Sequence, residues 1–464
     1  MDGFSFGIPR DSDFGFWILD FGLGARRDQS KIQNPKSKIR HLLLILLLIL
    51  IPSRSVAQES PDQDDQLGVY EALAVARQRS PMLNQLREQV RAKGGQWWMS
   101  FGIDAPEVAY VKEGIAGGQF EEQRWLLSQT IDFPLQSYYR LRRVGTEQEA
   151  LQLDVEAGLN DVTVAVKKAY TELLYTQELV HVRQEEVDLA EALHEAASVR
   201  VEVGEASELE LMKAEIGLAE AQSNREDARR RFQNARYALF NVVGLDPDEQ
   251  HYAVEFPDTL VYFSVEIDED HVLQRIDVQP ELLSAARNLE ATRLGVRQTR
   301  SALLPDLKLD VFVQDYGLGY DPVGFQVGLR VPLWLLPNHK GRMRAAKADV
   351  QRQSWKQQSV FLDLKKQVEQ TWHSYQTSKQ TIERYHTAIR GRADELLRLT
   401  QDGYRIGELD LLTLLDTQRT YLSSQLRYYD ALRDYYFHLI DLERYLGEDI
   451  VFNPAYAPVL GATK

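Results

Sequence analysis

Alternating apolar and polar positions mark two pairs of short segments. In residues 307–313 and 325–333, leucine, valine and phenylalanine take every second position, and mostly polar residues stand between them. Residues 107–116 and 123–133 show a similar but less regular alternation. A period of two puts successive side chains on opposite faces of a β-strand. The pattern therefore predicts two β-hairpins, one in each half of the chain, which turn at Gly117-Gly118 and at residues 316–322.

A helical period covers most of the remaining chain. Residues 137–203 contain no proline, and apolar residues such as Val162, Val166 and Ala169 recur three or four positions apart. Residues 341–406 match this composition, and in each half a short glycine-containing break precedes a second helical stretch. The spacing predicts long helices packed as coiled-coil pairs. Ser207 and Asp410 are predicted to be the N-caps of the returning helices. A further helix of about 30 residues is expected after residue 66.

The two halves repeat the same landmarks in the same order. The matching pairs are Pro81 and Pro280 (199 apart), Pro106 and Pro305 (199), Pro134 and Pro332 (198), Gly204 and Gly407 (203), and Gly244 and Gly447 (203). A period near 200 is far longer than that of a solenoid repeat. We therefore expect a duplicated module of helix, β-hairpin and long helix pair. The predicted divisions are repeat 1 at 67–250, an inter-repeat linker at 251–270, repeat 2 at 271–450 and a C-terminal tail at 451–464.

The N-terminal region has the order of a secretory leader. Basic residues precede the apolar run Leu42–Ile51, and Pro52 and Ser55-Val56-Ala57 follow it. This is the arrangement of a signal peptide, and the run is shorter than the roughly 20 residues that a spanning helix needs. We expect residues 1–57 to be a leader and signal peptide, and residues 58–66 to be a polar linker. A membrane anchor is the alternative interpretation of the apolar run.

The predicted strands suit either of two environments. Each is about 9–11 residues long with one apolar and one polar face, as in strands that span an outer membrane. A soluble hairpin packed on a core shows the same alternation. The strand pattern alone leaves both interpretations open.

The amino-acid composition argues against several classes of function. The net charge of −15 argues against nucleic-acid binding, which needs a basic face, and the absence of cysteine excludes thiolate chemistry and disulfides. The nine histidines are scattered, and the sequence contains no phosphate-binding loop, zinc-protease motif or nucleophile elbow. We expect no enzyme activity and no catalytic, cofactor-binding or metal-binding residues.

One segment carries a more specific resemblance. Tyr404–Asp416 reads Tyr-Arg-Ile-Gly-Glu-Leu-Asp-Leu-Leu-Thr-Leu-Leu-Asp. It resembles the periplasmic-tip motif of the TolC-type outer-membrane efflux proteins, and the order of elements over about residues 67–450 is similar to theirs. Ser80-Pro81 and Pro106-Glu107 are most similar to the heavy-metal (cobalt–zinc–cadmium) resistance branch.

The resemblance implies a fold, an assembly and a function. The fold is mainly α with a small β part: a long α-helical coiled-coil barrel protomer whose four strands contribute to a 12-stranded transmembrane β-barrel shared by a homotrimer. The implied protein is a channel in the outer membrane, with helices extending into the periplasm. It exports small molecules or metal ions as the exit duct of a tripartite efflux or type I secretion system. Its partners are outer-membrane lipid, a periplasmic adaptor and, through the adaptor, a proton-driven or ABC inner-membrane pump.

The resemblance also suggests site residues. Relatives close the tunnel with acidic residues after the tip motif, at offsets that fall here on Thr413 and Asp416 and, in repeat 1, on Glu210 and Lys213. Thr413 departs from the acidic pattern, so an alternating ring of Asp416 and Lys213 is the hypothesis for a periplasmic gate; two solvated helix faces are the alternative. The adaptor-docking tips are expected at Gly204, Glu205, Gly407 and Glu408.

Two other functions compete with the duct. A soluble periplasmic coiled-coil scaffold or adaptor subunit would share the helical hairpins, although an adaptor usually carries one hairpin and additional short-stranded domains. A cell-wall or surface enzyme would need a site that the sequence lacks.

Overall fold

The computed structural model describes residues 67–101, 103–114, 121–204, 206–246, 256–315, 323–331, 336–453 and 456. All of them belong to one compact unit, Asp64–Lys464. The predicted leader, signal peptide and polar linker lie outside the described residues, as do both hairpin turns and most of the C-terminal tail.

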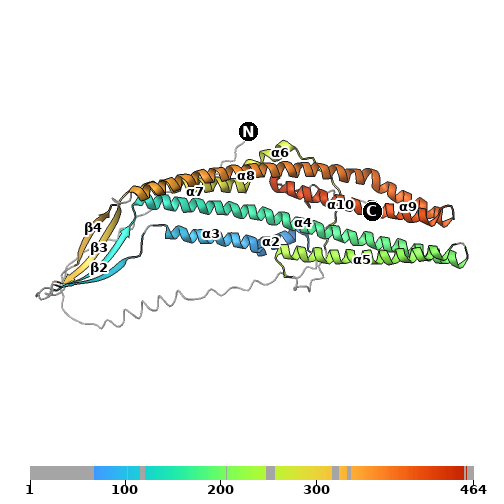
Figure 1. Ribbon diagram of the computed structural model, residues 1–464, viewed down its shortest axis with the longest axis horizontal. Helices are drawn as coiled ribbons and strands as arrows, with labels where there is room; N and C mark the ends of the chain where they lie inside the picture. The colour runs from blue at the N-terminus through green and yellow to red at the C-terminus, as the bar shows by residue number, and fades with distance from the viewer. Residues whose placement is uncertain are drawn as a thin grey trace, which may run out of the picture. The chain divides into compact units, whose positions relative to one another are not determined.

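Repeat 1 contains a helical segment, a hairpin and a helix pair (Figure 1). Its elements are α2 (Val69–Arg79), α3 (Pro81–Met99), β1 (Glu107–Gly114), β2 (Glu121–Ile131), α4 (Pro134–Glu202) and α5 (Glu208–Val243). The single helix of about 30 residues that we predicted is two helices, because Pro81 occupies the first turn of α3 and Ser80 is extended. A proline ring clashes with a preceding helical turn and provides no N–H, so it starts a helix and does not continue one.

Repeat 2 follows the same order. Its elements are α6 (Glu269–Gln274), the 3₁₀ turn η1 (Ile276–Val278), α7 (Pro280–Ser301), β3 (Asp306–Asp315), β4 (Gly324–Arg330), α8 (Leu336–Arg384), η2 (Tyr385–Ile389), α9 (Arg390–Arg405) and α10 (Leu411–Leu446). The second long tract is therefore not one helix as predicted. A π-helical turn, η2, separates α8 from α9, whereas α4 runs through 69 residues without a break.

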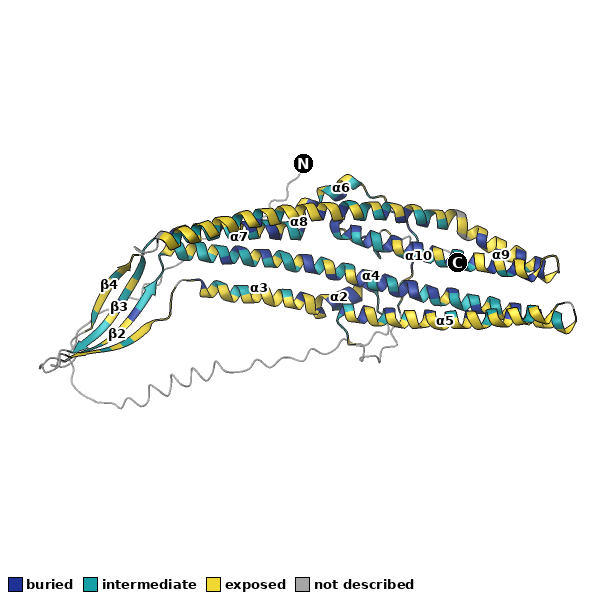
Figure 2. Cartoon of the chain, in the orientation of Figure 1, coloured by how far each residue is buried: buried dark blue, intermediate teal, exposed yellow. Residues whose placement is uncertain are grey.

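Helix α4 lies at the centre of the helical packing. It contacts α3, α5, α7 and α10, while α8 contacts α7 and α10. Figure 2 shows buried residues concentrated where α2, α4 and α10 meet. The core there consists of aliphatic and tyrosine side chains, including the fully buried Tyr170, Tyr435 and Leu439. Tyrosines near the C-terminus, including Tyr428, Tyr436 and Tyr445, are therefore packing residues of this core.

The four strands form one antiparallel sheet in the order β1-β2-β3-β4, which joins the hairpins of both repeats. It lies at the end of the unit where α4 and α8 begin (Figure 1). The helix-to-helix turns α4–α5 and α9–α10 lie at the other end, so each repeat connects the sheet to a helical tip. We use the name tips for these two turns, residues 203–207 and 406–410.

Candidate functional site at the sheet and the helical tips

One face of the sheet is a continuous apolar surface. The strand pairing places Val108 beside Leu127, Leu127 beside Val311, and Val311 beside Phe325. Residues two positions along each strand join the same face. On β4, Phe325, Val327 and Leu329 are 81%, 62% and 66% exposed. Side chains this apolar and this exposed need a partner or an apolar solvent to cover them.

The opposite face is polar and its groups pair with one another. The Ser128 hydroxyl donates to the carboxylate of Asp310, and Lys308 Nζ lies 3.5 Å from Asp310 Oδ1. The Arg124 guanidinium lies over the Phe312 ring, 5.9 Å from its centre. Polar groups therefore pair on this face of the two central strands, β2 and β3, opposite the apolar face.

Each tip is a tight turn made possible by a glycine. Gly204 and Gly407 have φ of +78° and +80°, the left-handed region that other residues rarely adopt. At the second tip, the Glu408 and Leu409 N–H groups both donate to the Gly403 carbonyl. Among the predicted docking residues, Glu205 lies outside the described residues.

The two tips share a small core. Leu193 and Ala197 of α4 and Ala214 of α5 pack with Leu411 and Leu414 of α10. Tyr404 of α9 joins this cluster, and the Arg200 guanidinium of α4 lies 5.1 Å from the centre of its ring. The helix pairs of the two repeats are thus fixed to each other close to their turns.

A groove lies between the helix pairs next to this core. It has a volume of about 620 Å³, and its walls come from α4, α5 and α10. Lys213 and Asp416 both line it and are exposed, but no ion pair joins them within the described part of the chain. Apolar side chains such as Ile216, Leu412 and Leu415 line the same groove. The structure therefore brings together two of the four predicted gate residues.

The other two gate residues lie in the first turns of their helices. Glu210 donates its backbone N–H to the Ser207 carbonyl, and Thr413 donates its backbone N–H to Asp410 Oδ1 at 2.8 Å. Hydrogen bonding from Thr413, first from its side chain and then from this backbone N–H, lowers the pKa of the Asp410 carboxyl, because it favours the charged form. Asp410 is therefore the side-chain N-cap that we predicted. Ser207 stands at the N-cap position of α5, but its side chain makes no capping bond.

Comparison with known proteins shows what this chain is similar to. Residues 274–448 match the sequence model of the family described as outer membrane efflux protein. The cobalt-zinc-cadmium resistance protein CzcC of Cupriavidus metallidurans is 23% identical over 317 residues, which cover 66% of this chain and 73% of CzcC.

Solved structures show the same fold. A membrane protein from Pseudomonas aeruginosa superposes with a TM-score of 0.71 at 16% identity, over 83% of this chain and 90% of the other. The outer membrane protein VceC from Vibrio cholerae gives 0.69 at 17% identity, over 82% and 96%. The resemblance to the TolC-type outer-membrane efflux proteins is confirmed.

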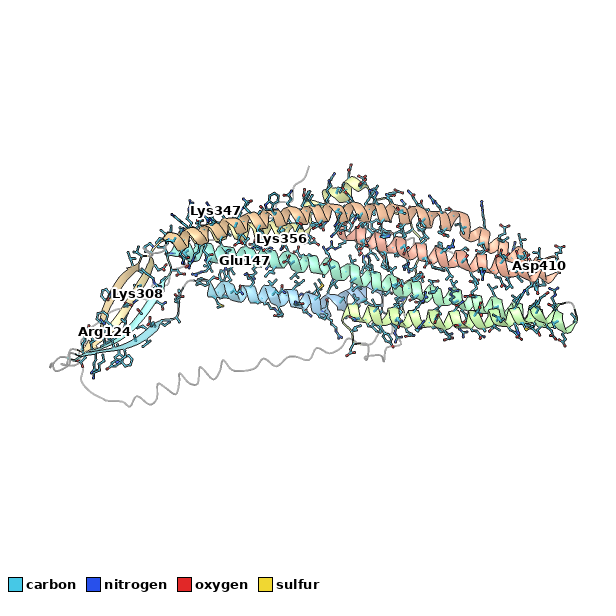
Figure 3. All side chains as sticks on the ribbon, in the orientation of Figure 1. Arg124, Glu147, Lys308, Lys347, Lys356 and Asp410 are labelled. Carbon is cyan, nitrogen blue, oxygen red and sulfur yellow. The ribbon has the colours of Figure 1, made fainter. Side chains whose placement is uncertain are left out.

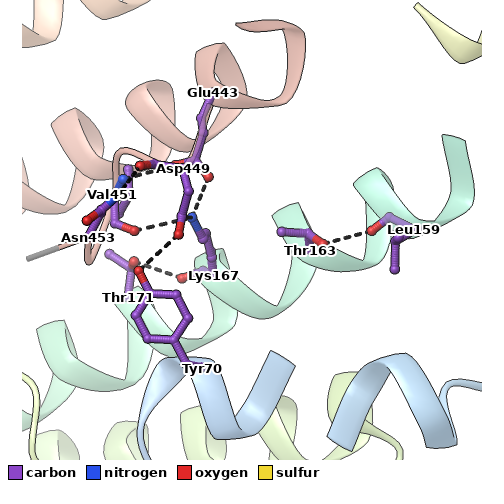
Figure 4. A network of polar contacts seen from close by, with 9 residues as sticks. All are labelled: Tyr70, Leu159, Thr163, Lys167, Thr171, Glu443, Asp449, Val451 and Asn453. Carbon is purple, nitrogen blue, oxygen red and sulfur yellow. Dashed lines mark hydrogen bonds and ion pairs between the residues drawn. The ribbon is translucent and has the colours of Figure 1, made fainter. Parts of the chain in front are cut away.

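The chain also contains a buried ion-pair network that was not predicted from the sequence (Figure 4). Lys167 of α4 is 1% exposed, and its ammonium pairs with the Glu443 carboxylate of α10. It also donates to Asp449 Oδ1 at 2.6 Å and to the Val451 carbonyl. Burial raises the pKa of Glu443, and the neighbouring ammonium acts in the opposite direction.

The network ties repeat 1 to the end of repeat 2. Glu443 accepts a bond from the Val451 N–H, and Tyr70 donates its hydroxyl to Asp449. The signal in the sequence was a lysine on an apolar helix face, between Val166 and Tyr170. A charge at such a position needs a buried partner.

The predicted inter-repeat linker provides a second set of contacts. Its residues 256–267 are neither helix nor strand, and Leu260 and Phe263 are buried. Every second carbonyl accepts a hydroxyl from a helix: Val261 from Tyr436, Phe263 from Tyr435 and Val265 from Tyr375. We call residues 256–267 the strap.

The strap also reaches the π-helical turn. The Tyr262 ring lies 5.2 Å from the His386 ring, and the Tyr262 hydroxyl donates to Glu383 Oε1 at 3.1 Å. The segment between the repeats therefore packs against α8, η2 and α10 of repeat 2. In the sequence, Val261, Phe263, Val265 and Ile267 alternate with other residues as in a strand, but the segment joins no described sheet, so this alternation does not reveal its helical partners.

Two negative results concern only the described residues. No group of three or more histidines and carboxylates among them is placed to hold a metal ion. None of the described helices has both the length and the apolar character that crossing a membrane requires.

Proposed function

We propose that this chain is one protomer of a trimeric exit duct in an outer membrane, with helices that extend into the periplasm. It acts passively, as the last component of a tripartite efflux or type I secretion system whose inner-membrane pump and periplasmic adaptor supply the energy and the connection. The fold shared with the outer-membrane channels and the match to the efflux family support this proposal.

The observation that carries the proposal is a sheet with an apolar face and two free edges. Among the described strands, β1 and β4 each have one neighbour, so one side of each strand presents unpaired backbone groups. Such groups cost several kcal/mol each in hydrocarbon. Four strands are too few to close a barrel. Three copies would give twelve strands, with β4 of one copy beside β1 of the next.

We take the proposed class of substrate from CzcC, the relative described above. CzcC is described as a cobalt-zinc-cadmium resistance protein, and this chain aligns with most of its length. We propose divalent metal ions as the exported class and assign the chain to the heavy-metal branch. The acidic tips are compatible with cation transit: residues 402–416 hold four acidic residues and one basic residue.

Lys213 and Asp416 are proposed as the gate, and the two tips as the docking sites of the adaptor. Both gate residues are exposed in one groove of a single chain. In a trimer their charges would alternate around the periplasmic end of the tunnel. Ion pairs between neighbouring copies would hold this end closed.

Fractionation of cells that express the full chain tests the function. We expect the protein in the outer-membrane fraction, as a trimer that converts to monomer only on heating, and channels in planar bilayers. Release by osmotic shock, without channel activity, would instead support the periplasmic scaffold.

Planar-bilayer recordings also test the gate. Asp416→Ala should raise the closed-state conductance, because it removes one partner of each proposed ion pair. Asp363→Ala is the matched control, since Asp363 is an exposed carboxylate of α8 outside the groove. A closed-state conductance of Asp416→Ala equal to that of the wild type would exclude the ion-pair gate.

A further inference from the structure

Charge is distributed unevenly between the two ends of the helices. Residues 336–356, where α8 begins beside the sheet, hold six basic residues and one acidic residue, so their net charge is +5. Residues 202–215, around the first tip, hold five acidic residues and one basic residue, a net charge of −4. Figure 3 shows Lys308 and Lys347 near the sheet and Asp410 at the opposite end. The start of α8 is basic although the whole chain is acidic.

Three of these basic residues form an exposed row. Lys340, Arg344 and Lys347 are spaced i, i+4 and i+7, which places them on one face of α8. All three are exposed, and none forms an ion pair within the described residues. The first turn of α8 also contains no acidic residue. Unpaired positive charges on one exposed face attract an external anion.

Exposed aromatic and apolar residues lie at the same end. At the end of α3 and in the connection to β1, Trp98, Met99 and Ile103 are 71%, 84% and 68% exposed. The Trp97, Trp98 and Phe101 rings pack together with centres 5.1–5.7 Å apart. This cluster continues into the apolar face of the sheet, since Ile103 pairs with Ile131 of β2. Tryptophan is enriched where hydrocarbon meets lipid headgroups.

We propose that the helix-to-sheet junction binds anionic phospholipid headgroups of the leaflet that faces the periplasm. Lys340, Arg344 and Lys347 contact the phosphates, and the Trp97–Phe101 cluster lies at the level of the headgroups. The inference rests on the proposed function, which puts the apolar face of the sheet in lipid. Charge complementarity and continuity with that face favour lipid as the occupant.

Lipid titration of the full-length trimer in detergent tests the proposal. The probes are dioleoylphosphatidylglycerol, which is anionic, and dioleoylphosphatidylcholine, which carries no net charge. We expect the wild type to bind the anionic lipid at least about tenfold more tightly, with a preference that falls as salt rises. Lys340→Gln/Arg344→Gln/Lys347→Gln should lose most of this preference, up to about 100-fold, if each charge contributes the usual electrostatic attraction near a membrane surface.

A second triple variant controls for the loss of charge. Lys365→Gln/Lys366→Gln/Arg384→Gln removes the same charge from the same helix, but Lys365, the nearest of the three, lies about 27 Å further along α8 than Lys347. That distance is more than twice the screening length at physiological salt. The control should keep the preference for the anionic lipid.

The outcomes separate this inference from the proposed function. Equal binding of both lipids by a wild-type trimer, or an unchanged preference in the first triple variant, overturns the headgroup site and leaves the duct intact. A changed ion selectivity of the channel with an unchanged lipid preference also overturns it, because the row would then face the lumen. If neither the wild type nor the variants form outer-membrane trimers, the proposed function fails, and the headgroup site fails with it.

Discussion

The long helical tracts of the two repeats reach the same end of the molecule by different constructions. In repeat 1, Pro134 and Gly204 are 70 residues apart and α4 is continuous; in repeat 2, Pro332 and Gly407 are 75 apart and η2 interrupts the tract. Five extra residues in a regular helix would rotate everything beyond them by about 140°. A π-helical turn takes up one additional residue. The other four precede α8, which begins at Leu336, 71 residues before Gly407, so α9 arrives in nearly the same phase as the end of α4.

The helical tracts of the two repeats have therefore diverged, while the core that both tips share remains packed. The π-turn keeps Tyr404 and Leu411 facing the core that both tips share. The strap contacts that turn through Tyr262, and repeat 1 is instead fixed through Lys167. Repeat 1 thus relies on helix continuity and a buried ion pair, while repeat 2 relies on a helical irregularity that the strap covers.

The largest expected effect is loss of the trimer on deletion of a single residue from α4. Deletion of Thr387 from η2 should convert the π-turn to α-helix and preserve the trimer, because it removes the residue that the turn absorbs. Deletion of Gln184, at the equivalent place in α4, should rotate Leu193 and Ala197 by about 100° out of the tip core and abolish the trimer. Size-exclusion chromatography with multi-angle light scattering measures both. Equal tolerance of the two deletions would contradict the phase argument.

Replacement of the buried Lys167 should have the next largest effect, a decrease in the free energy of unfolding. Lys167→Met leaves Glu443 buried without its counter-charge, which typically costs about 3–5 kcal/mol. Lys168→Met is the matched control: its ammonium is 31% exposed and pairs with Asp441, so the cost should be about 0–1 kcal/mol. Chemical denaturation followed by circular dichroism measures the difference. Similar midpoints for the two variants would show that the network does not tie the repeats together.

Each hydrogen bond to the strap should contribute less to the free energy of unfolding than the buried ion pair of Lys167. Tyr435→Phe removes the hydroxyl that donates to the Phe263 carbonyl at 2.9 Å and leaves that buried acceptor unpaired. A loss of about 1–3 kcal/mol is expected. The outcome is checked by thermal unfolding and by faster amide exchange in residues 256–267. Tyr237→Phe, at an exposed position of α5, is the control. If strap exchange in Tyr435→Phe matches the control, the hydroxyl does not hold the strap.

The smallest expected effect is a difference in amide exchange between the two tips. Asp410→Ala should speed amide exchange in the first turn of α10 several-fold, whereas Ser207→Ala should change α5 little, because only Asp410 forms a side-chain cap. The folded-state pKa of Asp410 is lowered, so its stabilisation is present above the ordinary carboxyl pKa and is lost as the pH falls through the lowered value. Hydrogen exchange as a function of pH measures both. Acid-induced fraying of the two tips to the same extent would contradict the difference in capping.

The sequence predicts most of the architecture, since its signals are periodic. The strand alternation, the long helices and the tip glycines Gly204 and Gly407 follow directly from residue type and spacing. Even the π-turn has a signal, because the offset between repeats changes from 198 at Pro134 to 203 at Gly204. The strap and the partners of Lys167 could not be predicted. Both depend on contacts between residues more than 100 positions apart, and the local period of each segment, helical around Lys167 and of two in the strap, does not identify the partners.

The proposed gate shows the same limit of prediction from the sequence. Lys213 and Asp416 were found by counting from the tip glycines, and the structure places both in one groove. Their proposed pairing joins different copies of the chain, so neither the sequence nor a single chain determines it.

Cross-linking of the sheet edges tests the central claim most directly. The chain has no cysteine, so Val108→Cys on β1 and Val327→Cys on β4 provide the only thiols. Within one chain these strands are three strand spacings apart, about 14 Å, beyond the reach of a short thiol cross-linker. We predict covalent trimers on a denaturing gel, with no ladder when Val327→Cys is replaced by Ser359→Cys on α8. A double-cysteine protein that remains monomeric, although both thiols react with the reagent, would contradict a sheet shared by three chains.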